Sequence, residues 1–483
     1  MRLIILFVAI SLVSTIAVAS PNKVVCYFGA WSVYRQGNGK FDINGIDPTL
    51  CTHLIYSFVG VNGKDVKVLD PWSDLPGNLD GFGKFTSLRK KNPSVKIMVA
   101  VGGWNAGSVP FSQMASDQAT REAFAQNVVK FLQQYQFDGF DIDWEYPAQR
   151  GGSPADVKNM VKLCKALKKA FVQHDYILSA AVAAPETSAS KSYDIAEMSQ
   201  YLDFINLMTY DFHGPWDGHT GMHAPPSASS HDSGNELKLN VKAAVKYWLQ
   251  NGVPKEKLVV GVPAYGKSFT LSNPSNKGLG APVSGAGTAG PYTGENGLLG
   301  YNEICEMQKA GDWEVVQDNE KGVPYAVKGN QWVSFDDLAA IKAKAQFIKQ
   351  EGLGGAMVWS IETDDFKGLC GEKYPVLKAL NSVLGRGGSS SPAETKRKNN
   401  VPDDQPAPPR SFAEDSAPEA PVEPEVSSES GECSSVGQFL VGQNCGYLVC
   451  DDDGMGGFRK IPGVCPQGLC FNPANNYCDW PSQ

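Results

Sequence analysis

Short apolar runs recur between residues 23 and 362 and set the first expectation about the fold. The eight runs are KVVCYFGAW (23 to 31), HLIYSFVGV (53 to 61), KIMVAVGGW (96 to 104), GFDIDWEYP (139 to 147), ILSAAVAAP (177 to 185), FINLMTYDF (204 to 212), KLVVGVPAY (257 to 265) and GGAMVWSIE (354 to 362). Several are nearly continuous in apolar residues, as is typical of parallel strands covered on both faces. Each run is therefore predicted to be a buried β-strand.

Many of these strands are separated by segments whose apolar residues have helical spacing, for example residues 120 to 135, 155 to 173 and 334 to 350. In the last of these, Ser334 and Asp337 form a predicted capping box. Eight strands alternating with helices predict an α/β fold, a (β/α)8 TIM barrel. The interval over about 267 to 333 is too long for one crossover, so we expect an α+β insertion subdomain there.

The two ends of the 483-residue chain differ in composition from this body. Residues 1 to 19 combine Arg2, an apolar run and small residues before Ser20, which predicts a secretory signal peptide. Residues 386 to 432 are rich in Pro, Ser, Glu and Ala and are expected to be a disordered linker. The predicted parts are thus a signal (1 to 19), a body (20 to 385), this linker, and a small disulfide-rich module (433 to 483).

The net charge of -8 comes without a basic stripe. It argues against nucleic acid or an anionic membrane surface as the main partner. Beyond the predicted signal, no stretch is apolar for long enough to cross a bilayer. We therefore expect a secreted, extracellular protein, a monomer, that acts on a neutral substrate.

Most of the eleven cysteines are disulfide candidates in an oxidising compartment. The body contains Cys26, Cys51, Cys164, Cys305 and Cys370, and the module contains Cys433, Cys445, Cys450, Cys465, Cys470 and Cys478. Cys164 lies in a predicted helix and is expected to be free and buried. Six cysteines allow fifteen pairings, so the connectivity of the module stays open.

The fourth predicted strand carries the candidate chemistry. Strand side chains alternate faces, so Asp141, Asp143 and Glu145 share one face and the apolar residues between them share the other. Alternate Cα atoms lie about 6.6 Å apart, and neighbouring carboxylates at such spacing retain at least one proton near neutral pH. Glu145 is closest to the strand's carboxyl end, where barrel enzymes do their chemistry. It is the predicted general acid, with the aspartates sharing or relaying a proton behind it.

Metal sites are the main alternatives for these residues. A calcium loop fits poorly, because the spacers are Phe, Ile and Trp and the glycine for the sharp turn is missing. A divalent-metal site is disfavoured by ligand preferences. Three histidines follow the sixth strand (His213, His219 and His223), but no cysteine or acidic cluster with ligand spacing accompanies them. No metal and no cofactor are expected.

The segment DGFDIDWEYP (138 to 147) resembles the active-site strand of glycoside hydrolase family 18, the chitinase family. Four further segments agree in the same order: CYFGAW (26 to 31), VAVGGWN (99 to 105), LMTYDFHG (207 to 214) and GAMVWSIETDDFKGLCG (355 to 371). The stretch with GLGAPVSGAGTAGPYT and GYNEIC is similar to the family's insertion domain. The resemblance covers the whole body and implies the pairs Cys26 with Cys51 and Cys305 with Cys370.

The resemblance implies an endochitinase that cleaves β-1,4 bonds between N-acetylglucosamine units of chitin and chitooligosaccharides by substrate-assisted retention. Glu145 would protonate the glycosidic oxygen while the substrate's acetamido oxygen attacks the anomeric carbon. Asp143 would hold the acetamido N–H and stabilise the oxazolinium-like intermediate, and Asp141 would take part in the proton exchange. Tyr210 would donate to the acetamido carbonyl.

The resemblance also implies a sugar-binding groove. Asp211 would bind hydroxyls, Met208 would line the pocket, and Trp359 would form its floor, because the C–H faces of a pyranose pack on indole. Further aromatic residues stand at strand ends or in following loops: Tyr27, Trp31, Phe58, Trp104, Trp216 and Tyr265. For any one of them core packing is an equal alternative, but together they favour a groove.

Three positions depart from the family pattern. Ala100 replaces a serine common in relatives, Lys267 replaces an arginine, so that a point charge stands where a bidentate fork is usual, and Glu362 stands where aspartate is frequent. These changes leave the predicted acid in place. Two rival functions remain, a chitinase-like lectin that binds without turnover and an endo-β-N-acetylglucosaminidase that acts on glycans.

The C-terminal segment resembles a peritrophin-type chitin-binding module, chiefly in its closing CPxGLxFNxxxxxCDWP pattern. It departs from the pattern because no cysteine follows Trp480 and because Cys470 occupies a usually apolar position. Tyr447, Phe458, Tyr477 and Trp480 are its candidate sugar contacts. A purely structural disulfide knot is the alternative.

Overall fold

The computed structural model describes residues 22 to 385 and, beyond them, the backbone of five short strands. The predicted signal peptide and linker lie outside the described residues, as do Cys433, Cys445, Cys465 and Trp480. Side chains of the remaining module residues, including Cys450, Cys470 and Cys478, also lie outside the description. The pairing of the module cysteines therefore stays a prediction.

Two compact units divide the chain, Met1–Ala393 and Glu394–Gln483. Within the second unit, β16 (Phe439–Val441), β17 (Tyr447–Asp452) and β18 (Phe458–Gly463) form an antiparallel sheet, and β19 (Cys470–Asn472) pairs with β20 (Tyr477–Asp479). The described part of this unit thus consists of short antiparallel strands.

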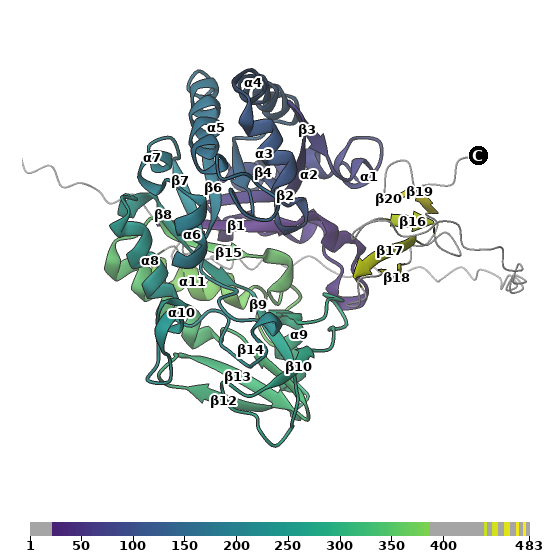
Figure 1. Ribbon diagram of the computed structural model, residues 1–483, viewed down its shortest axis with the longest axis vertical. Helices are drawn as coiled ribbons and strands as arrows, with labels where there is room; N and C mark the ends of the chain where they lie inside the picture. Colours follow the sequence, from purple (N-terminus) through teal and green to yellow (C-terminus); the bar gives the residue numbers. More distant parts are fainter. Residues whose placement is uncertain are drawn as a thin grey trace, which may run out of the picture. The chain divides into compact units, whose positions relative to one another are not determined.

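Eight parallel strands form the centre of the first unit (Figure 1). They follow the order β1-β15-β8-β7-β6-β5-β4-β2, and β1 also pairs with β2, which closes the barrel. A short antiparallel strand, β3 (Asp65–Val68), extends β2. The TIM barrel prediction is confirmed. The barrel strands are β1 (Lys23–Gly29), β2 (His53–Asn62), β4 (Lys96–Gly102), β5 (Gly139–Asp143), β6 (Ile177–Ala183), β7 (Phe204–Met208), β8 (Leu258–Pro263) and β15 (Gly355–Trp359).

Seven of the eight predicted strands end earlier than the apolar runs do. The run at 139 to 147, for example, leaves the sheet after Asp143, and the run at 204 to 212 leaves it after Met208. The large side chains beyond these points sit in loops at the carboxyl ends of the strands. Hydrophobicity alone does not distinguish a residue that belongs to a strand from one that lies in the loop beyond the strand's end.

Helices cover the outside of the barrel (Figure 1). Apolar residues of β5 and of the position just beyond it pack beneath them: Phe140 meets Phe124 edge to face, and Trp144 stacks on Phe111. The described helices are α1 (Pro71–Asp74), α2 (Gly81–Thr86), α3 (Val109–Ser116), α4 (Gln118–Tyr135), α5 (Asp156–Phe171), α6 (Glu186–Ser192), α7 (Ile195–Ser199), α8 (Val241–Gln250), α9 (Tyr301–Lys309), α10 (Leu338–Glu351) and α11 (Pro375–Leu384), of which α9 belongs to the inserted segment.

The start of α10 corrects one local prediction. Its N-cap is Asp337, whose carboxylate accepts a hydrogen bond from the backbone N–H of Ala340 at 2.8 Å. Ser334 instead ends β14 (Gln331–Ser334), where its hydroxyl accepts from the backbone N–H of His223 at 2.9 Å. The predicted capping box between Ser334 and Asp337 is therefore wrong, because Ser334 is the last residue of β14 and not the N-cap of α10.

An antiparallel sheet is inserted between β8 and α10. Its strands follow the order β10-β9-β14-β13-β12, with β11 paired to β9, and α9 lies within the same segment. The strands are β9 (Tyr265–Leu271), β10 (Val283–Ala286), β11 (Leu298–Gly300), β12 (Glu314–Asp318), β13 (Val323–Lys328) and β14. The first of them begins directly beyond β8, so the inserted sheet starts at the carboxyl end of the barrel.

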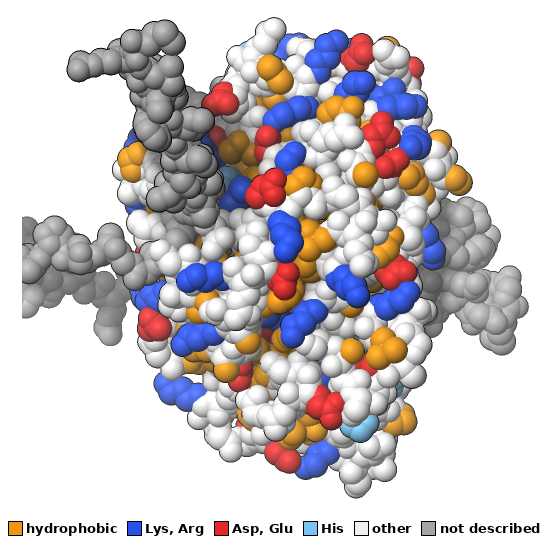
Figure 2. Space-filling model, turned by 90° about the vertical axis from the view of Figure 1, so that its left-hand side faces the viewer, with side chains coloured by type: hydrophobic (Ala, Val, Ile, Leu, Met, Phe, Trp, Pro, Cys, Tyr) orange, Lys and Arg blue, Asp and Glu red, His pale blue; other side chains and the backbone are white. Residues whose placement is uncertain are grey.

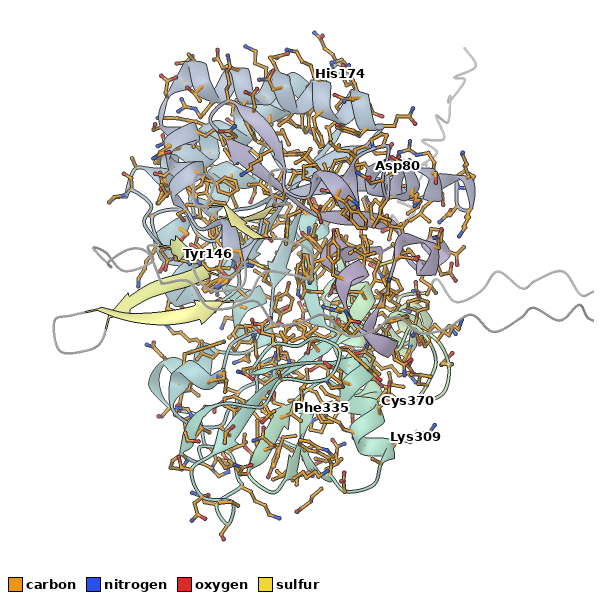
Figure 3. The ribbon with its side chains drawn as sticks, turned by 90° about the vertical axis from the view of Figure 1, so that its right-hand side faces the viewer. Asp80, Tyr146, His174, Lys309, Phe335 and Cys370 are labelled. Atoms are coloured by element: carbon orange, nitrogen blue, oxygen red, sulfur yellow. A yellow bond between two sulfur atoms is a disulfide. The ribbon has the colours of Figure 1, made fainter. Side chains whose placement is uncertain are left out.

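Two disulfides occur in the described part of the first unit. Cys26 of β1 is bonded to Cys51 just before β2, and Cys305 of α9 is bonded to Cys370 (labelled in Figure 3). Cys164 in α5 is free and buried. All three expectations for the cysteines of the body are confirmed.

The surface mixes charges of both signs. On the face drawn in Figure 2, lysine and arginine side chains are interspersed with aspartate and glutamate. Within the described residues, no helix has the length and apolar character needed to cross a bilayer.

Candidate active site

The acidic ladder lies where β5 leaves the barrel. Asp141 and Asp143 belong to β5, and Glu145 follows two residues after its end. Asp141 is fully buried, Asp143 nearly so, and Glu145 is 9% exposed. The ladder thus rises from the barrel interior to its mouth, with Glu145 nearest to solvent.

Asp141 is held by donors from three strands. Its Oδ2 accepts from the Tyr27 hydroxyl at 2.7 Å, and its Oδ1 accepts from the Ser179 hydroxyl at 2.5 Å and from the Asn206 amide at 3.3 Å. Asn206 also donates to the Tyr27 oxygen at 3.0 Å. Burial raises the pKa of Asp141 to about 6, and these hydrogen bonds oppose the rise.

Two members of this cluster, Ser179 and Asn206, were missed from the sequence. Each is a polar residue inside an apolar strand, which is a usable signal because buried polar groups need partners. The hydroxyl absent at Ala100 of β4 is compensated on the other side, since Ala100 and Ser179 flank Asp141 in the sheet register.

Tyr27 differs from its expected place in a groove. Its side chain is 1% exposed, and its hydroxyl is committed to Asp141. Burial, together with the charges of Asp141 and Asp143, raises the pKa of Tyr27 well above its ordinary value, so the ring stays a neutral donor. Tyr27 therefore supports the lowest carboxyl of the ladder rather than offering a surface to a ligand.

Asp143 and Glu145 are poised to share a proton. Burial, followed by the charges of Glu145 and Asp141, raises the pKa of Asp143 well above its ordinary value. Burial also raises the pKa of Glu145 to about 7, while a hydrogen bond with the Tyr146 side chain and the charge of Arg150 oppose the rise. Two such carboxyls in one desolvated site do not both ionise near neutral pH. The arrangement supplies a proton donor at the barrel mouth.

Tyr210 stands close to the ladder with a weakly engaged hydroxyl. The hydroxyl donates to the Met357 sulfur at 3.7 Å, a weak acceptor. Burial and the nearby charge of Asp143 raise the pKa of Tyr210 well above its ordinary value. Tyr210 is thus a neutral O–H donor that has only a weak acceptor among the described residues and can donate to a stronger acceptor on a bound ligand.

Asp211 is ionised by its surroundings. Its carboxylate accepts from the Tyr265 hydroxyl at 2.6 Å, pairs with Lys267 at 3.1 Å, and lies 3.6 Å from Nδ1 of His223. Burial raises its pKa, but Lys267 and His223 outweigh that effect and hold the pKa at about 2. Lys267 therefore pairs with this carboxylate as a point charge. Tyr265 is buried, so it positions Asp211 instead of lining an open surface.

Aromatic side chains gather around β15 and the neighbouring loops. The ring of Trp359 stacks on Phe58, with 5.8 Å between centroids, and Phe58 stacks on Trp31 at 6.1 Å. Trp359 and Met208 are partly exposed. The most exposed of the predicted rings are Trp31 at 43%, Trp104 at 58% and Trp216 at 62%. These rings provide apolar platforms near the acids.

The histidines and the acidic residues make ordinary contacts instead of a ligand set. His213 faces Asp217 at 3.1 Å, and His223 faces Asp211. Within residues 22 to 385, the one close group of potential metal ligands is Cys305, Cys370 and Asp365. Its sulfurs are disulfide bonded, and the Asp365 carboxylate accepts from two backbone N–H groups.

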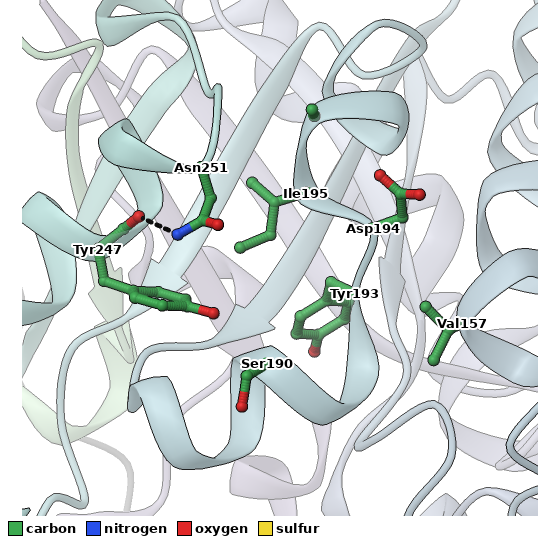
Figure 4. Close-up of a pocket in the computed structure, with 8 residues that line it drawn as sticks. Val157, Ser190, Tyr193, Asp194, Ile195, Tyr247 and Asn251 are labelled. Atoms are coloured by element: carbon green, nitrogen blue, oxygen red, sulfur yellow. Dashed lines mark hydrogen bonds between the residues drawn. The ribbon is translucent and has the colours of Figure 1, made fainter.

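An open hollow of about 370 Å³ lies elsewhere, between α5, α6, α7 and α8 (Figure 4). It is lined by Val157, Ser190, Tyr193, Asp194, Ile195, Ala196, Tyr247 and Asn251. None of the predicted site residues is among them. The hollow is therefore separate from the acidic ladder.

A family model for glycosyl hydrolases family 18 matches residues 23 to 364. The chain belongs to glycosyl hydrolase family 18. This family 18 chain is accordingly a glycoside hydrolase, and the match runs from β1 to the loop that follows β15.

Relatives of this family 18 chain include two animal proteins. The Endochitinase of Manduca sexta is 43% identical over 387 residues, which cover 78% of this chain and 70% of the relative. Chitotriosidase-1 of Mus musculus is 37% identical over 478 residues, covering 95% of this chain and 96% of the relative. The second alignment extends beyond the barrel into the C-terminal segment.

Solved structures give the same fold. The Ostrinia furnacalis Group IV chitinase in complex with allosamidin is 45% identical, with a TM-score of 0.74, and the match covers 76% of this chain and 100% of the other. Human YKL-39, described as a pseudo-chitinase that retains chitooligosaccharide binding, is 40% identical with a TM-score of 0.71, over 75% of this chain and 100% of the other. Similar structures thus include both a chitinase and a pseudo-chitinase that retains chitooligosaccharide binding.

Proposed function

We propose that this family 18 chain is a secreted endochitinase that hydrolyses β-1,4 bonds between N-acetylglucosamine units of chitin with retention of configuration. The observation that carries the proposal is the Glu145 carboxyl, held protonated near neutral pH at the barrel mouth above two buried aspartates. A protonated acid at this position can donate to a glycosidic oxygen. The endochitinase among the relatives supports the choice of substrate.

The reaction proceeds in two displacements at the anomeric carbon. Glu145 gives its proton to the glycosidic oxygen, the bond from that oxygen to the anomeric carbon breaks, and the acetamido oxygen of the same sugar bonds to that carbon. Water then attacks the same carbon and breaks its bond to the acetamido oxygen, which opens the oxazolinium ring and restores the acetamido group. The attacking water gives one proton to Glu145. Two inversions give net retention, so the first product is the β-anomer.

The other residues of the site hold the attacking acetamido group. Asp143 has an Oδ1 that accepts no hydrogen bond from any described residue, and it would accept the acetamido N–H. Tyr210 would donate to the acetamido oxygen, in exchange for its weak contact with the Met357 sulfur. Asp141, which lies deeper in the barrel, would exchange a proton with Asp143.

Sugar binding would use the ionised Asp211 and the exposed rings. The Asp211 carboxylate is an acceptor for a sugar hydroxyl, and the Trp359 indole is an apolar floor for a pyranose face. Exposed rings on separate loops, Trp31, Trp104 and Trp216, would extend contact to several sugars. Contact with several sugars along exposed rings would suit cleavage within a polymer.

The test is the anomeric form of the first product, read by proton NMR within minutes of mixing with chitohexaose. We expect the β-anomer from the wild-type protein and no turnover from Glu145→Gln. An α-anomer as first product would refute the substrate-assisted route. Oligomer binding without turnover in the wild type would favour the alternative, a chitinase-like lectin, for which the similarity to human YKL-39 speaks.

We further propose that residues 1 to 19 direct secretion and that the segment 433 to 483 binds chitin through a linker over 386 to 432. A tethered module raises local concentration on an insoluble polymer without taking part in cleavage. Deletion from residue 386 onward should weaken adsorption to solid chitin and leave the cleavage of short oligomers nearly intact. Unchanged adsorption would argue against the module's role.

A further inference from the structure

Arg150 connects two loops of the site. It lies five residues after Glu145, with a left-handed backbone at φ 50° and an exposed side chain. Its Nη1 donates to the carbonyl oxygen of Glu145 at 3.0 Å and to that of Trp104 at 2.8 Å. One guanidinium thus bonds the loop that follows β4 to the loop that carries the acid.

The same guanidinium covers one face of an indole. Its central carbon lies 3.6 Å from the centroid of the Trp104 ring. An arginine can stack flat on an aromatic ring while its N–H groups reach carbonyl oxygens at the edge, which the ammonium of lysine cannot do. Among the described residues, no aromatic ring stacks on Trp104, so Arg150 is its stacking partner in this part of the chain.

The loop around Arg150 is held by other contacts. The Gln149 amide donates to the hydroxyls of Ser188 at 2.8 Å and Ser192 at 2.7 Å. The buried Asp156 carboxylate accepts from the Ser153 backbone N–H at 2.7 Å. Removal of the Arg150 side chain should therefore leave this loop in place and release mainly the Trp104 indole.

Trp104 is an exposed ring with one face occupied. Its side chain remains 58% exposed although the Arg150 guanidinium lies over the ring. An indole that is free to rotate would offer a stacked sugar many orientations, whereas a clamped indole offers one. Fixed geometry near a proton donor matters, because small displacements of a reacting bond lower its rate steeply.

We propose that Arg150 is a positioning residue that clamps the Trp104 indole, so that a sugar stacked on this exposed ring is held in register with the Glu145 carboxyl. The inference rests on the proposed function of Glu145 as proton donor. It assigns Arg150 a task in substrate alignment that neither the acidic ladder nor the aromatic platforms perform alone.

A double-mutant cycle on chitohexaose tests this clamp. R150Q and W104A should each lower kcat/KM about tenfold, and the double variant should lose no more than about twofold beyond W104A, because residues that act as one unit are not additive. R150K keeps the charge but cannot stack and reach both carbonyls, so its loss should be about threefold. A purely structural role would instead give losses that multiply.

Arg89 supplies the matched control. Its guanidinium donates to the Gln136 carbonyl at 2.7 Å and pairs with Asp138 at 3.2 Å, at the end of β5 away from Glu145. R89Q should therefore leave kcat/KM within about twofold of wild type. Unfolding midpoints of all variants report on the fold. If the unfolding midpoint of R150Q is lower than that of wild type, the double-mutant cycle of R150K with W104A is used in place of the R150Q cycle to test the clamp.

Two results would overturn the clamp: kcat/KM in R150Q within twofold of wild type, or losses of R150Q and W104A that multiply in the double variant. Absence of turnover in the wild type is a different failure, that of the proposed function. The coupling is then measured as the Kd of chitohexaose by calorimetry. Equal Kd values in wild type and R150Q would overturn the clamp on its own.

Discussion

Replacement of Glu145 by glutamine should stabilise the fold, and more so at alkaline pH. The substitution keeps the shape of the side chain and removes its ionisation. Burial raises the pKa of Glu145 from an ordinary value of 4.5 to about 7. The folded state therefore binds more protons than the unfolded state between these two values, so the contribution of Glu145 to stability is fully present below pH 4.5 and is lost as pH rises through 7.

The size of the effect follows from the shift. A change from 4.5 to about 7, at roughly 1.4 kcal/mol per pKa unit, corresponds to about 3 kcal/mol of stability that wild type loses and Glu145→Gln does not. The figure is an upper value, because Asp143 shares the same desolvated space and holds part of the proton. A destabilisation of this size is typical of the strain that active sites retain for function.

Thermal unfolding midpoints of wild type and Glu145→Gln at pH 4.5, 6, 7.5 and 9 provide the assay. We expect nearly equal midpoints at the lowest pH and an advantage for the variant that grows with pH and levels off above pH 8. Glu122→Gln, in α4, is the control for exchanging an exposed glutamate.

Two outcomes would refute this reasoning. A difference between the midpoints that stays constant from pH 4.5 to 9 would mean that Glu145 has the same pKa in the folded and unfolded chain. Greater stability of wild type at pH 9 would mean that the folded state stabilises the ionised carboxylate. Either result would also remove the proton donor on which the proposed mechanism depends.

Three further predictions can be checked with the same protein. The kcat/KM for chitooligosaccharides should fall as pH rises above about 7, because the required protonated form of Glu145 is lost, and a profile that stays flat to pH 9 contradicts this. Lys267→Met removes the cation that holds the pKa of Asp211 at about 2, so KM should rise about threefold to tenfold with little change in kcat, as measured by steady-state kinetics. Replacement of Cys26 and Cys51 by alanine opens a link of sequence separation 25 and should lower the free energy of unfolding by about 3 kcal/mol in denaturant titrations.

The strands were predictable because burial on both faces demands continuous apolar residues, which can be counted along the chain. Their ends were not, since Trp104 and Glu145 look like strand residues although they stand in loops beyond the sheet. The ladder of Asp141, Asp143 and Glu145 followed from the alternation of strand side chains, a purely local property.

The partners of these acids are a different matter. Ser179 and Asn206 are single polar residues in apolar strands, and only the closed barrel brings them to the oxygen atoms of Asp141. Tyr27 was expected in a groove, but its side chain points inward, because the buried carboxyl of Asp141 requires hydrogen-bond donors and the Tyr27 hydroxyl is one of them. Lys267 reaches Asp211 from β9 of the inserted sheet, whereas His223 reaches it from the same segment between β7 and α8 that carries Asp211.

By itself, the order of residues determined the barrel and the line of carboxyl groups, since each depends on periodicity read along one stretch of chain. The two disulfides of the body followed from the resemblance to family 18. Tertiary structure alone decided how acidic each carboxyl is and which rings are free to meet a sugar. Desolvation, charge pairing and the stack of Arg150 on Trp104 depend on atoms from distant segments, and their separation in space is set by how the strands and loops pack.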